Sequence, residues 1–177
     1  MELGSDGRLR GVPFIPSPNC DARPQDVIVE LLVVHGISLP PGRFGGDAIP
    51  RPFTNALDCA EDPYFAALKD VRVSSHFLIR RGGDIIQFVQ CDLRAWHAGV
   101  SEWRGRGRCN DFSIGIELEG VDTAPYLEAQ YRQLQRLAAL LARRYPIADI
   151  VGHSDIAPGR KTDPGPAFDW AHFRAAS

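Results

Sequence analysis

The run VIVELLVVHG at residues 27–36 decides how the rest of the chain can be arranged. Its apolar and β-branched residues predict a buried strand over 27–34 that runs out at His35. A second run, SIGIELE at 113–119, alternates strictly, so that Glu117 and Glu119 lie on the same face. Both runs predict strands, so the chain is expected to be built around a β-sheet.

Strands and helices intermix along the rest of the sequence. Further strands are predicted over residues 73–80, 84–90 and 147–151, the first two joined by a hairpin turn at RGGD. Helices are predicted over residues 63–70, over 127–145 and from Asp169 onward. Glycine and proline concentrate in two long loops, residues 38–60 and 94–111. This mixture predicts an α/β or α+β fold in which helices pack on a sheet.

The composition predicts one globular domain, residues 1–177. Of the 177 residues, 44% are hydrophobic and 24% are charged, which is ordinary for a folded domain. The net charge of -2 argues against a nucleic acid or an anionic membrane as the partner, and no obligate protein partner is evident. No apolar run is long enough to span a bilayer, and residues 1–11 carry no apolar run of a signal peptide. Four cysteines without a C-x-x-C pair are typical of reduced thiols, so a cytoplasmic location is expected.

Two of the five histidines follow apolar strands, which points to a binding site at one edge of the sheet. His35 ends VVH and His153 ends IVGH. The segment after His153, HSDIAPGRKTDPGP, is expected to be a stiff loop without helix that returns Asp163 toward His153. Two imidazoles and one carboxylate form a catalytic zinc set with a fourth position open for water. Asp155 or His76 could equally be the third ligand, and each histidine could instead be satisfied by a backbone carbonyl.

Glu117 and Glu119 are the candidate proton carriers. Because they share one face of a strand, spacing does not choose between them, and both could be solvated carboxylates at the edge of the sheet. Lys161 could lend positive charge to a developing oxyanion or be an ordinary loop lysine.

The remaining histidines and a group of arginines carry weaker signals. His76 in VSSHFLIRR is expected to be structural, or to support a ligand. His97 in RAWHAG lies in a loop and suits a contact with substrate, whereas His172 is expected to pack. The arginines that alternate with glycine at positions 104, 106 and 108 suit a few substrate carboxylates better than a nucleic acid.

Taken together, five segments resemble one known family. They are LLVVHGISLPPGRFGG, VSSHFLIRRGGDIIQFV, RAWHAGVSEW, RCNDFSIGIELEG and GHSDIAPGRKTDPGPAFDW. The chain is similar from about Val12 to Phe173 to the AmpD-type N-acetylmuramoyl-L-alanine amidases, which use zinc. The resemblance implies an α/β fold with a mixed β-sheet flanked by helices, of the zinc amidase and peptidoglycan-recognition type. It also implies hydrolysis of the amide between anhydro-N-acetylmuramic acid and L-alanine in cytoplasmic muropeptides during cell-wall recycling.

The resemblance also implies a role for particular residues. The zinc ligands of the family fall on His35, His153 and Asp163. Its catalytic glutamate falls on Glu117, and its lysine that stabilises the transition state falls on Lys161. Substrate contacts are implied at Arg72 and Arg108, and His76 then supports the ligands.

The sequence departs from the family at one position and leaves two rival functions. Gly36 stands where AmpD-type sequences usually carry asparagine, so an amide contact near the substrate is missing or is supplied by another group. One rival is a peptidoglycan-binding module without catalysis, which the complete ligand set argues against. The other is a broad amidase that cuts intact peptidoglycan outside the cytoplasm.

Overall fold

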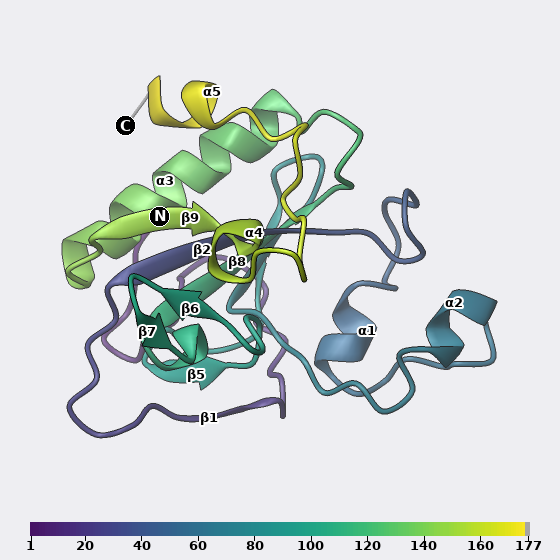
Figure 1. Ribbon diagram of the computed structural model, residues 1–177, viewed down its shortest axis with the longest axis horizontal. Coiled ribbons are helices and arrows are strands. Elements are labelled where there is room, and N and C mark those ends of the chain that lie inside the picture. The colour runs from purple at the N-terminus through teal and green to yellow at the C-terminus, as the bar shows by residue number, and fades with distance from the viewer. Residues whose placement is uncertain (176–177) are drawn as a thin grey trace.

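The computed structural model describes residues 1–175, and a five-stranded sheet forms its centre (Figure 1). The strands lie in the order β4-β3-β8-β2-β9, with bounds β2 (Leu31–Ile37), β3 (Phe77–Ile79), β4 (Ile85–Gln87), β8 (Ser113–Glu119) and β9 (Asp149–Gly152). All neighbours run parallel except β3 and β4. The predicted α/β fold with a mixed sheet is confirmed.

The remaining strands and helices surround this sheet. Two small antiparallel sheets pair β1 (Cys20–Ala22) with β5 (Leu93–Ala95), and β6 (Glu102–Trp103) with β7 (Arg106–Gly107). The helices are α1 (Pro50–Phe53), α2 (Pro63–Ala66), α3 (Glu128–Arg144), α4 (His153–Ile156), α5 (Trp170–Ala175) and the 3-10 turn η1 (Cys109–Asp111). Among the described residues, none of these helices combines the length and apolar character that crossing a bilayer requires.

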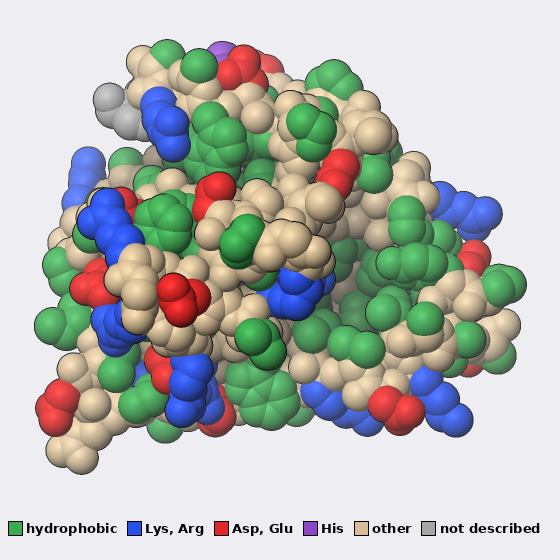
Figure 2. All heavy atoms as spheres, in the orientation of Figure 1, with side chains coloured by type: hydrophobic (Ala, Val, Ile, Leu, Met, Phe, Trp, Pro, Cys, Tyr) green, Lys and Arg blue, Asp and Glu red, His purple; other side chains and the backbone are tan. Residues whose placement is uncertain are grey.

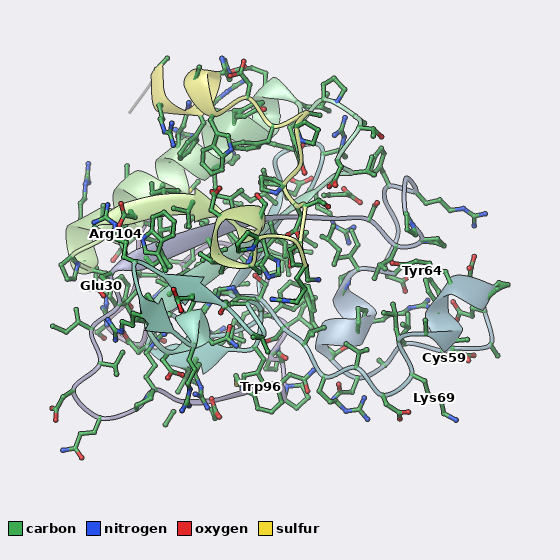
Figure 3. The ribbon with its side chains drawn as sticks, viewed as in Figure 1. Glu30, Cys59, Tyr64, Lys69, Trp96 and Arg104 are labelled. Carbon is green, nitrogen blue, oxygen red and sulfur yellow. The ribbon has the colours of Figure 1, made fainter. Side chains whose placement is uncertain are left out.

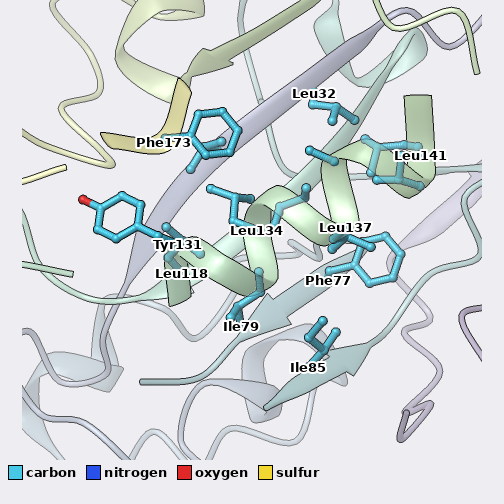
Figure 4. Close-up of a cluster of buried hydrophobic side chains, with 14 of the residues drawn as sticks. Leu32, Phe77, Ile79, Ile85, Leu118, Tyr131, Leu134, Leu137, Leu141 and Phe173 are labelled. Carbon is cyan, nitrogen blue, oxygen red and sulfur yellow. The ribbon is translucent and has the colours of Figure 1, made fainter. Parts of the chain in front are cut away.

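The long helix α3 covers one face of the sheet. It ends at Arg144, just before Pro146, and its buried stripe includes Leu134, Leu137 and Leu141. Figure 4 shows this stripe packed against side chains of β2, β3 and β8, which include Leu32, Phe77, Ile79 and Leu118. The opposite face is covered by the segments around α1 and α2 and by η1, with Phe53, Phe65, Leu78, Val33 and Phe112 in its two apolar clusters. Because both faces are covered, β2 and β8 are buried almost throughout.

Most predicted elements are present, with shifted ends. The strand at 113–119 and the hairpin between β3 and β4 are confirmed, and the long helix differs by one residue at each end. The strand predicted over 27–34 begins later, at Leu31, and continues to Ile37. Two predictions of pure loop are wrong, since residues 38–60 contain α1 and residues 94–111 contain β6, β7 and η1. The predicted single domain over 1–177 includes Ala176 and Ser177, which lie outside the described residues.

Candidate active site

Strand register brings His35, Glu117 and His153 together at the carboxyl edge of the sheet. His35 on β2 pairs with Glu117 on β8, and Val34 pairs with Gly152, the residue before His153. Side chains in register on neighbouring strands point to the same face. The carboxyl ends of parallel strands in such a sheet are the usual place for a binding site.

Asp163 reaches this edge on a returning segment. The segment begins with the helical turn α4, which corrects the prediction that it contains no helix. Four residues suffice for the turn before Pro158, and the Asp155 carboxylate caps it by accepting a hydrogen bond from the Gly152 amide at 2.7 Å. The Ser154 amide then donates to the Asp163 carbonyl at 2.9 Å, which fixes the carboxylate of Asp163 beside His153.

Three potential metal-ligand atoms converge here: His35 Nδ1, His153 Nδ1 and Asp163 Oδ2. The two nitrogens are 2.9 Å apart, and they lie 3.2 Å and 3.1 Å from the carboxylate oxygen. Zinc bonds of about 2.0–2.1 Å in a tetrahedron place neighbouring ligand atoms about 3.3 Å apart. The three residues therefore fit a zinc ion.

The tautomer of His153 also suits a metal. Its Nε2 lies 3.1 Å from the carbonyl oxygen of Ala98, which can only accept a hydrogen bond. Nε2 therefore carries a hydrogen, and in the neutral imidazole Nδ1 presents a lone pair to Asp163 Oδ2. Two electron-rich atoms at 3.1 Å repel each other unless a cation lies between them.

Burial shifts the pKa values of the surrounding groups in the direction that metal catalysis needs. It lowers the pKa of His35 to about 4, against the hydrogen bond and the charge of Asp163, which raise this pKa, so the imidazole is neutral at pH 7. Burial also raises the pKa of Glu117 well above its ordinary value, the negative charge of Asp163 adds to the rise, and Lys161 opposes it. Glu117 Oε2 is buried without a hydrogen-bond partner among residues 1–175. Such a carboxylate is suited to take up a proton.

The two glutamates of β8 differ sharply in their partners. Glu119 accepts hydrogen bonds from the backbone amides of Gly45 and Arg81, at 2.6 Å and 3.0 Å, and it pairs with Arg80 at 3.2 Å. Its carboxylate is therefore already satisfied, whereas Glu117 faces the three potential ligands. Both are buried, so the interpretation of either one as a solvated edge carboxylate is wrong.

A cavity of about 520 Å³ opens over these groups (Figure 2). Its floor carries the three potential ligands with Glu117, and Lys161 also lines it. The opposite wall is apolar and comes from α1, α2 and the segment that follows, with Phe53, Tyr64, Leu68, Val71 and Val73. Tyr64, labelled in Figure 3, belongs to this wall. The cavity therefore combines polar, potentially catalytic groups on its floor with an apolar wall opposite them.

The predicted substrate contacts lie differently from one another. His97 lines the cavity but directs both ring nitrogens to protein atoms, His35 Nε2 at 2.9 Å and Ser113 Oγ at 3.1 Å. Arg72 and Arg108 are exposed and are not among the described residues that line the cavity. Arg72 contacts the Lys69 and Val71 carbonyls, and Arg108 pairs with Asp111. Roles of these three in substrate binding stay predictions.

The other candidate ligands are occupied elsewhere. His76 is buried, accepts from the Gly115 amide at 3.0 Å through Nδ1, and donates to the Leu93 carbonyl at 3.1 Å. Its ring lies behind His97, with the two ring centroids 5.8 Å apart, as expected of a supporting residue. Asp155 is the cap of α4 described above. His172 packs edge-on against Tyr131, as predicted, but it is otherwise exposed and its Nε2 lies 2.8 Å from a Glu128 carboxylate oxygen.

Tyr126, which sequence analysis missed, occupies the place left open by Gly36. A Cβ atom on Gly36 would lie 2.3 Å from the Tyr126 hydroxyl oxygen, so this tyrosine and any side chain at position 36 exclude each other. The hydroxyl donates to the Pro164 carbonyl at 2.9 Å, next to Asp163. Ninety residues of sequence separate Tyr126 from Gly36, and no local pattern links them.

Comparisons with known proteins agree with this geometry. The profile of the N-acetylmuramoyl-L-alanine amidase family matches residues 24–166. The 1,6-anhydro-N-acetylmuramyl-L-alanine amidase AmpD of Escherichia coli is 58% identical over 174 residues, which cover 97% of this chain and 95% of that protein. A crystal structure of a selenomethionine AmpD derivative superimposes with a TM-score of 0.96 at 58% identity, over 99% of this chain and 98% of that one.

A more distant structure contains a bound substrate. It is the complex of the Escherichia coli amidase AmiD with anhydro-N-acetylmuramic acid-L-Ala-D-gamma-Glu-L-Lys, with 35% identity and a TM-score of 0.61. The match covers 85% of this chain and 59% of AmiD. By family profile, full-length similarity and fold, this chain belongs to the N-acetylmuramoyl-L-alanine amidases, in the branch represented by AmpD.

Proposed function

We propose that this protein uses zinc to hydrolyse the amide between anhydro-N-acetylmuramic acid and L-alanine in cytoplasmic muropeptides, during cell-wall recycling. The observation that carries the proposal is the convergence of His35, His153 and Asp163 beside the unpartnered Glu117 Oε2. The activity of the AmpD relatives, which are 1,6-anhydro-N-acetylmuramyl-L-alanine amidases, supports the choice of bond and of sugar. We further propose that residues 1–177 form one catalytic domain.

His35, His153 and Asp163 would hold the metal. A zinc ion bound there supplies a Lewis acid that polarises a carbonyl and lowers the pKa of water to about 7. Two neutral imidazoles and one carboxylate bring a single negative charge, so they leave net positive charge at the centre. The ligands thus preserve the electrophilic character that amide hydrolysis needs.

Glu117 would move the proton. Hydrolysis adds water across the amide, so that the carbonyl carbon gains the hydroxyl and the nitrogen of L-alanine gains the hydrogen. Glu117 takes the proton from the attacking water and passes it to the leaving amine. Its buried, otherwise unpartnered Oε2 is free for both transfers.

Lys161 and the apolar wall would position and stabilise the substrate. Lys161 lines the cavity and would stabilise the negative charge that develops on the carbonyl oxygen as water attacks. The apolar wall, which includes Phe53, Tyr64 and Leu68, suits the carbon skeleton of the substrate. Arg72 and Arg108 remain the proposed contacts to its polar groups. His97, whose two ring nitrogens are engaged by His35 and Ser113, would contact the substrate only through the rest of its ring.

A cytoplasmic location is also part of the proposal. The four cysteines are free, two of them buried and two partly exposed. Unpaired thiols are the usual state in a reducing compartment. Cell fractionation of a native host, with an antibody to the chain, tests the location directly.

The deciding experiment is mass spectrometry of products from anhydro-muramyl-tripeptide incubated with the purified protein. We expect free tripeptide and anhydro-N-acetylmuramic acid, with activity lost on chelation and restored by zinc. A parallel muropeptide without the anhydro ring separates this reaction from that of a broad amidase. Glu119→Gln is the matched control for Glu117→Gln, since both replace a buried carboxylate of the same strand. If the folded, zinc-loaded protein leaves the tripeptide intact but retains it on dialysis, the binding module is the correct function.

A further inference from the structure

One dipeptide, His97–Ala98, contacts both histidines of the candidate zinc site. The Ala98 carbonyl accepts from His153 Nε2 at 3.1 Å, and His97 Nδ1 lies 2.9 Å from His35 Nε2. Each contact falls on the ring nitrogen opposite the one that faces Asp163. Histidine ligands are commonly oriented through this second nitrogen.

A chain of hydrogen bonds settles the direction of the His97 contact. The Ser113 hydroxyl donates its single hydrogen to the Cys109 carbonyl at 2.6 Å, so its oxygen can only accept from His97 Nε2 at 3.1 Å. A neutral imidazole carries one ring hydrogen. With that hydrogen on Nε2, His97 Nδ1 accepts from His35 Nε2, and His35 Nδ1 is left with the lone pair that a metal requires.

The dipeptide is itself held firmly from two sides. Asn110 Oδ1 accepts hydrogen bonds from both of its backbone amides, at 3.0 Å from His97 and 2.8 Å from Ala98. Arg160 Nη2 donates to the Ala98 carbonyl at 2.8 Å, the same oxygen that His153 contacts. The dipeptide therefore has little freedom to turn away from the two histidines.

The sheet leaves room for the His97 ring at Gly115. Gly115 lies beneath the ring, where an added Cβ would come within 2.5 Å of His97 Cγ. Gly115 belongs to the same face of β8 as Ser113 and Glu117, so the strand that supplies the proton carrier also supports the ring. The close approach of the ring to Gly115 therefore fixes where the His97 side chain can lie.

We propose that His97–Ala98 is the orienting element of the zinc site and that Ser113, through His97, selects the metal-binding tautomer of His35. The inference rests on the proposed zinc site. It assigns His97 and Ser113 as positioning residues, and both lie outside the set that contacts the metal. Because both outer partners are uncharged, they orient the ligands without adding negative charge to the centre.

Zinc affinity of the metal-free protein tests the proposal without measuring catalysis. Competition with a chromophoric chelator gives the dissociation constant, and urea unfolding of the metal-free protein shows that each variant is folded. We expect Ser113→Ala to weaken zinc binding by about 10- to 100-fold. Ser75→Ala is the matched control, because Ser75 is equally buried and its hydroxyl donates to the Gly115 carbonyl at 2.9 Å. This control is expected to leave zinc affinity unchanged.

Two variants of His97 keep the test decisive if Ser113→Ala does not fold. In His97→Asn an amide oxygen can still accept near the position of Nδ1, whereas His97→Phe keeps a ring but offers no acceptor. We expect the phenylalanine variant to lose more zinc affinity than the asparagine variant. Nitrogen-15 spectra of the imidazoles should also show one His97 tautomer in the unmodified protein and a mixture in Ser113→Ala.

Each outcome bears on one of the two claims. Unchanged zinc affinity in Ser113→Ala and His97→Phe would overturn the orienting role while leaving the zinc site in place. Equal losses in Ser113→Ala and Ser75→Ala would also overturn it, because the effect would then be general destabilisation. If the unmodified protein fails to bind one zinc ion, the proposed function itself is wrong.

Discussion

Adding one methyl group at Gly36 should destabilise the protein, and removing one oxygen from Tyr126 should cancel that cost. The Cβ of Gly36→Ala would start 2.3 Å from the tyrosine oxygen, and ordinary contact begins at 3.4 Å, so the hydroxyl must move by about 1.1 Å. That shift breaks its 2.9 Å hydrogen bond to the Pro164 carbonyl.

Three contributions set the change in the free energy of unfolding that Gly36→Ala causes. Overpacking costs about 1–3 kcal/mol and the lost hydrogen bond costs about 0.5–1.5 kcal/mol. Replacing glycine in extended backbone returns about 0.4–1 kcal/mol through the unfolded chain. Gly36→Ala should therefore lower the free energy of unfolding by about 2 kcal/mol, within limits of about 0.5–4 kcal/mol. In a Tyr126→Phe background the nearest atom is Pro164 Cα at 3.4 Å, and the same change should cost almost nothing.

Urea unfolding of chelator-treated protein, followed by tryptophan fluorescence, measures all four members of this cycle. Gly120→Ala is an internal control, because its Cβ would meet the Tyr126 ring carbon Cε1 at 2.3 Å, and phenylalanine keeps that atom. Gly120→Ala should thus lower the free energy of unfolding with either tyrosine or phenylalanine at position 126. If Gly36→Ala costs the same with tyrosine and with phenylalanine at position 126, the explanation for Gly36 is wrong.

Three further outcomes separate the roles of the charged groups. Lys161→Ala should bind zinc normally but lose turnover by about a hundredfold or more, as single-turnover rates and zinc stoichiometry will show; near-native turnover would reject its assigned role. Glu117→Gln should abolish turnover yet stabilise the metal-free protein at neutral pH. Burial raises the pKa of Glu117, so its penalty on folding is absent below about pH 4, where both states are protonated, and grows as the pH rises. Urea midpoints of the two proteins should therefore separate between pH 4 and 7, and a constant difference would contradict this. Glu119→Gln should instead lower the free energy of unfolding by about 1–3 kcal/mol with zinc affinity unchanged, because it weakens the contacts to Arg80, Arg81 and Gly45.

Sequence patterns predicted the sheet well because its strands are marked by local periodicity. The alternation in SIGIELE gave β8 its observed bounds, and helical spacing gave α3 to within one residue. Short elements were missed where turn residues dominate. The β6–β7 hairpin turns at Arg104 and Gly105, both with positive φ, a pairing that lacks the usual asparagine or aspartate signal.

The candidate site could be predicted only as far as its residues carry local signals. Spacing alone could not choose Glu117 over Glu119, because the partners that satisfy Glu119 come from residue 45 and from the β3–β4 hairpin. Family resemblance chose Glu117, and the partners of Glu119 give the physical reason. Ser113 and Asn110 carry no local signal of their role, since a serine at the start of a strand and an asparagine in a loop are common, and only their contacts distinguish these two.

The candidate zinc ligands lie far apart along the chain, with His35 separated from His153 by 118 residues and from Asp163 by 128. A metal ion held by all three would close a covalently continuous loop of that length, much as a disulfide does. A cross-link around a loop of about 100 residues is worth roughly 5 kcal/mol in the chain-entropy account. Zinc would then act as a reversible cross-link between His35 in the N-terminal part of the chain and His153 and Asp163 in the C-terminal part. The supply of zinc would then govern the stability of the enzyme against unfolding as well as its chemistry.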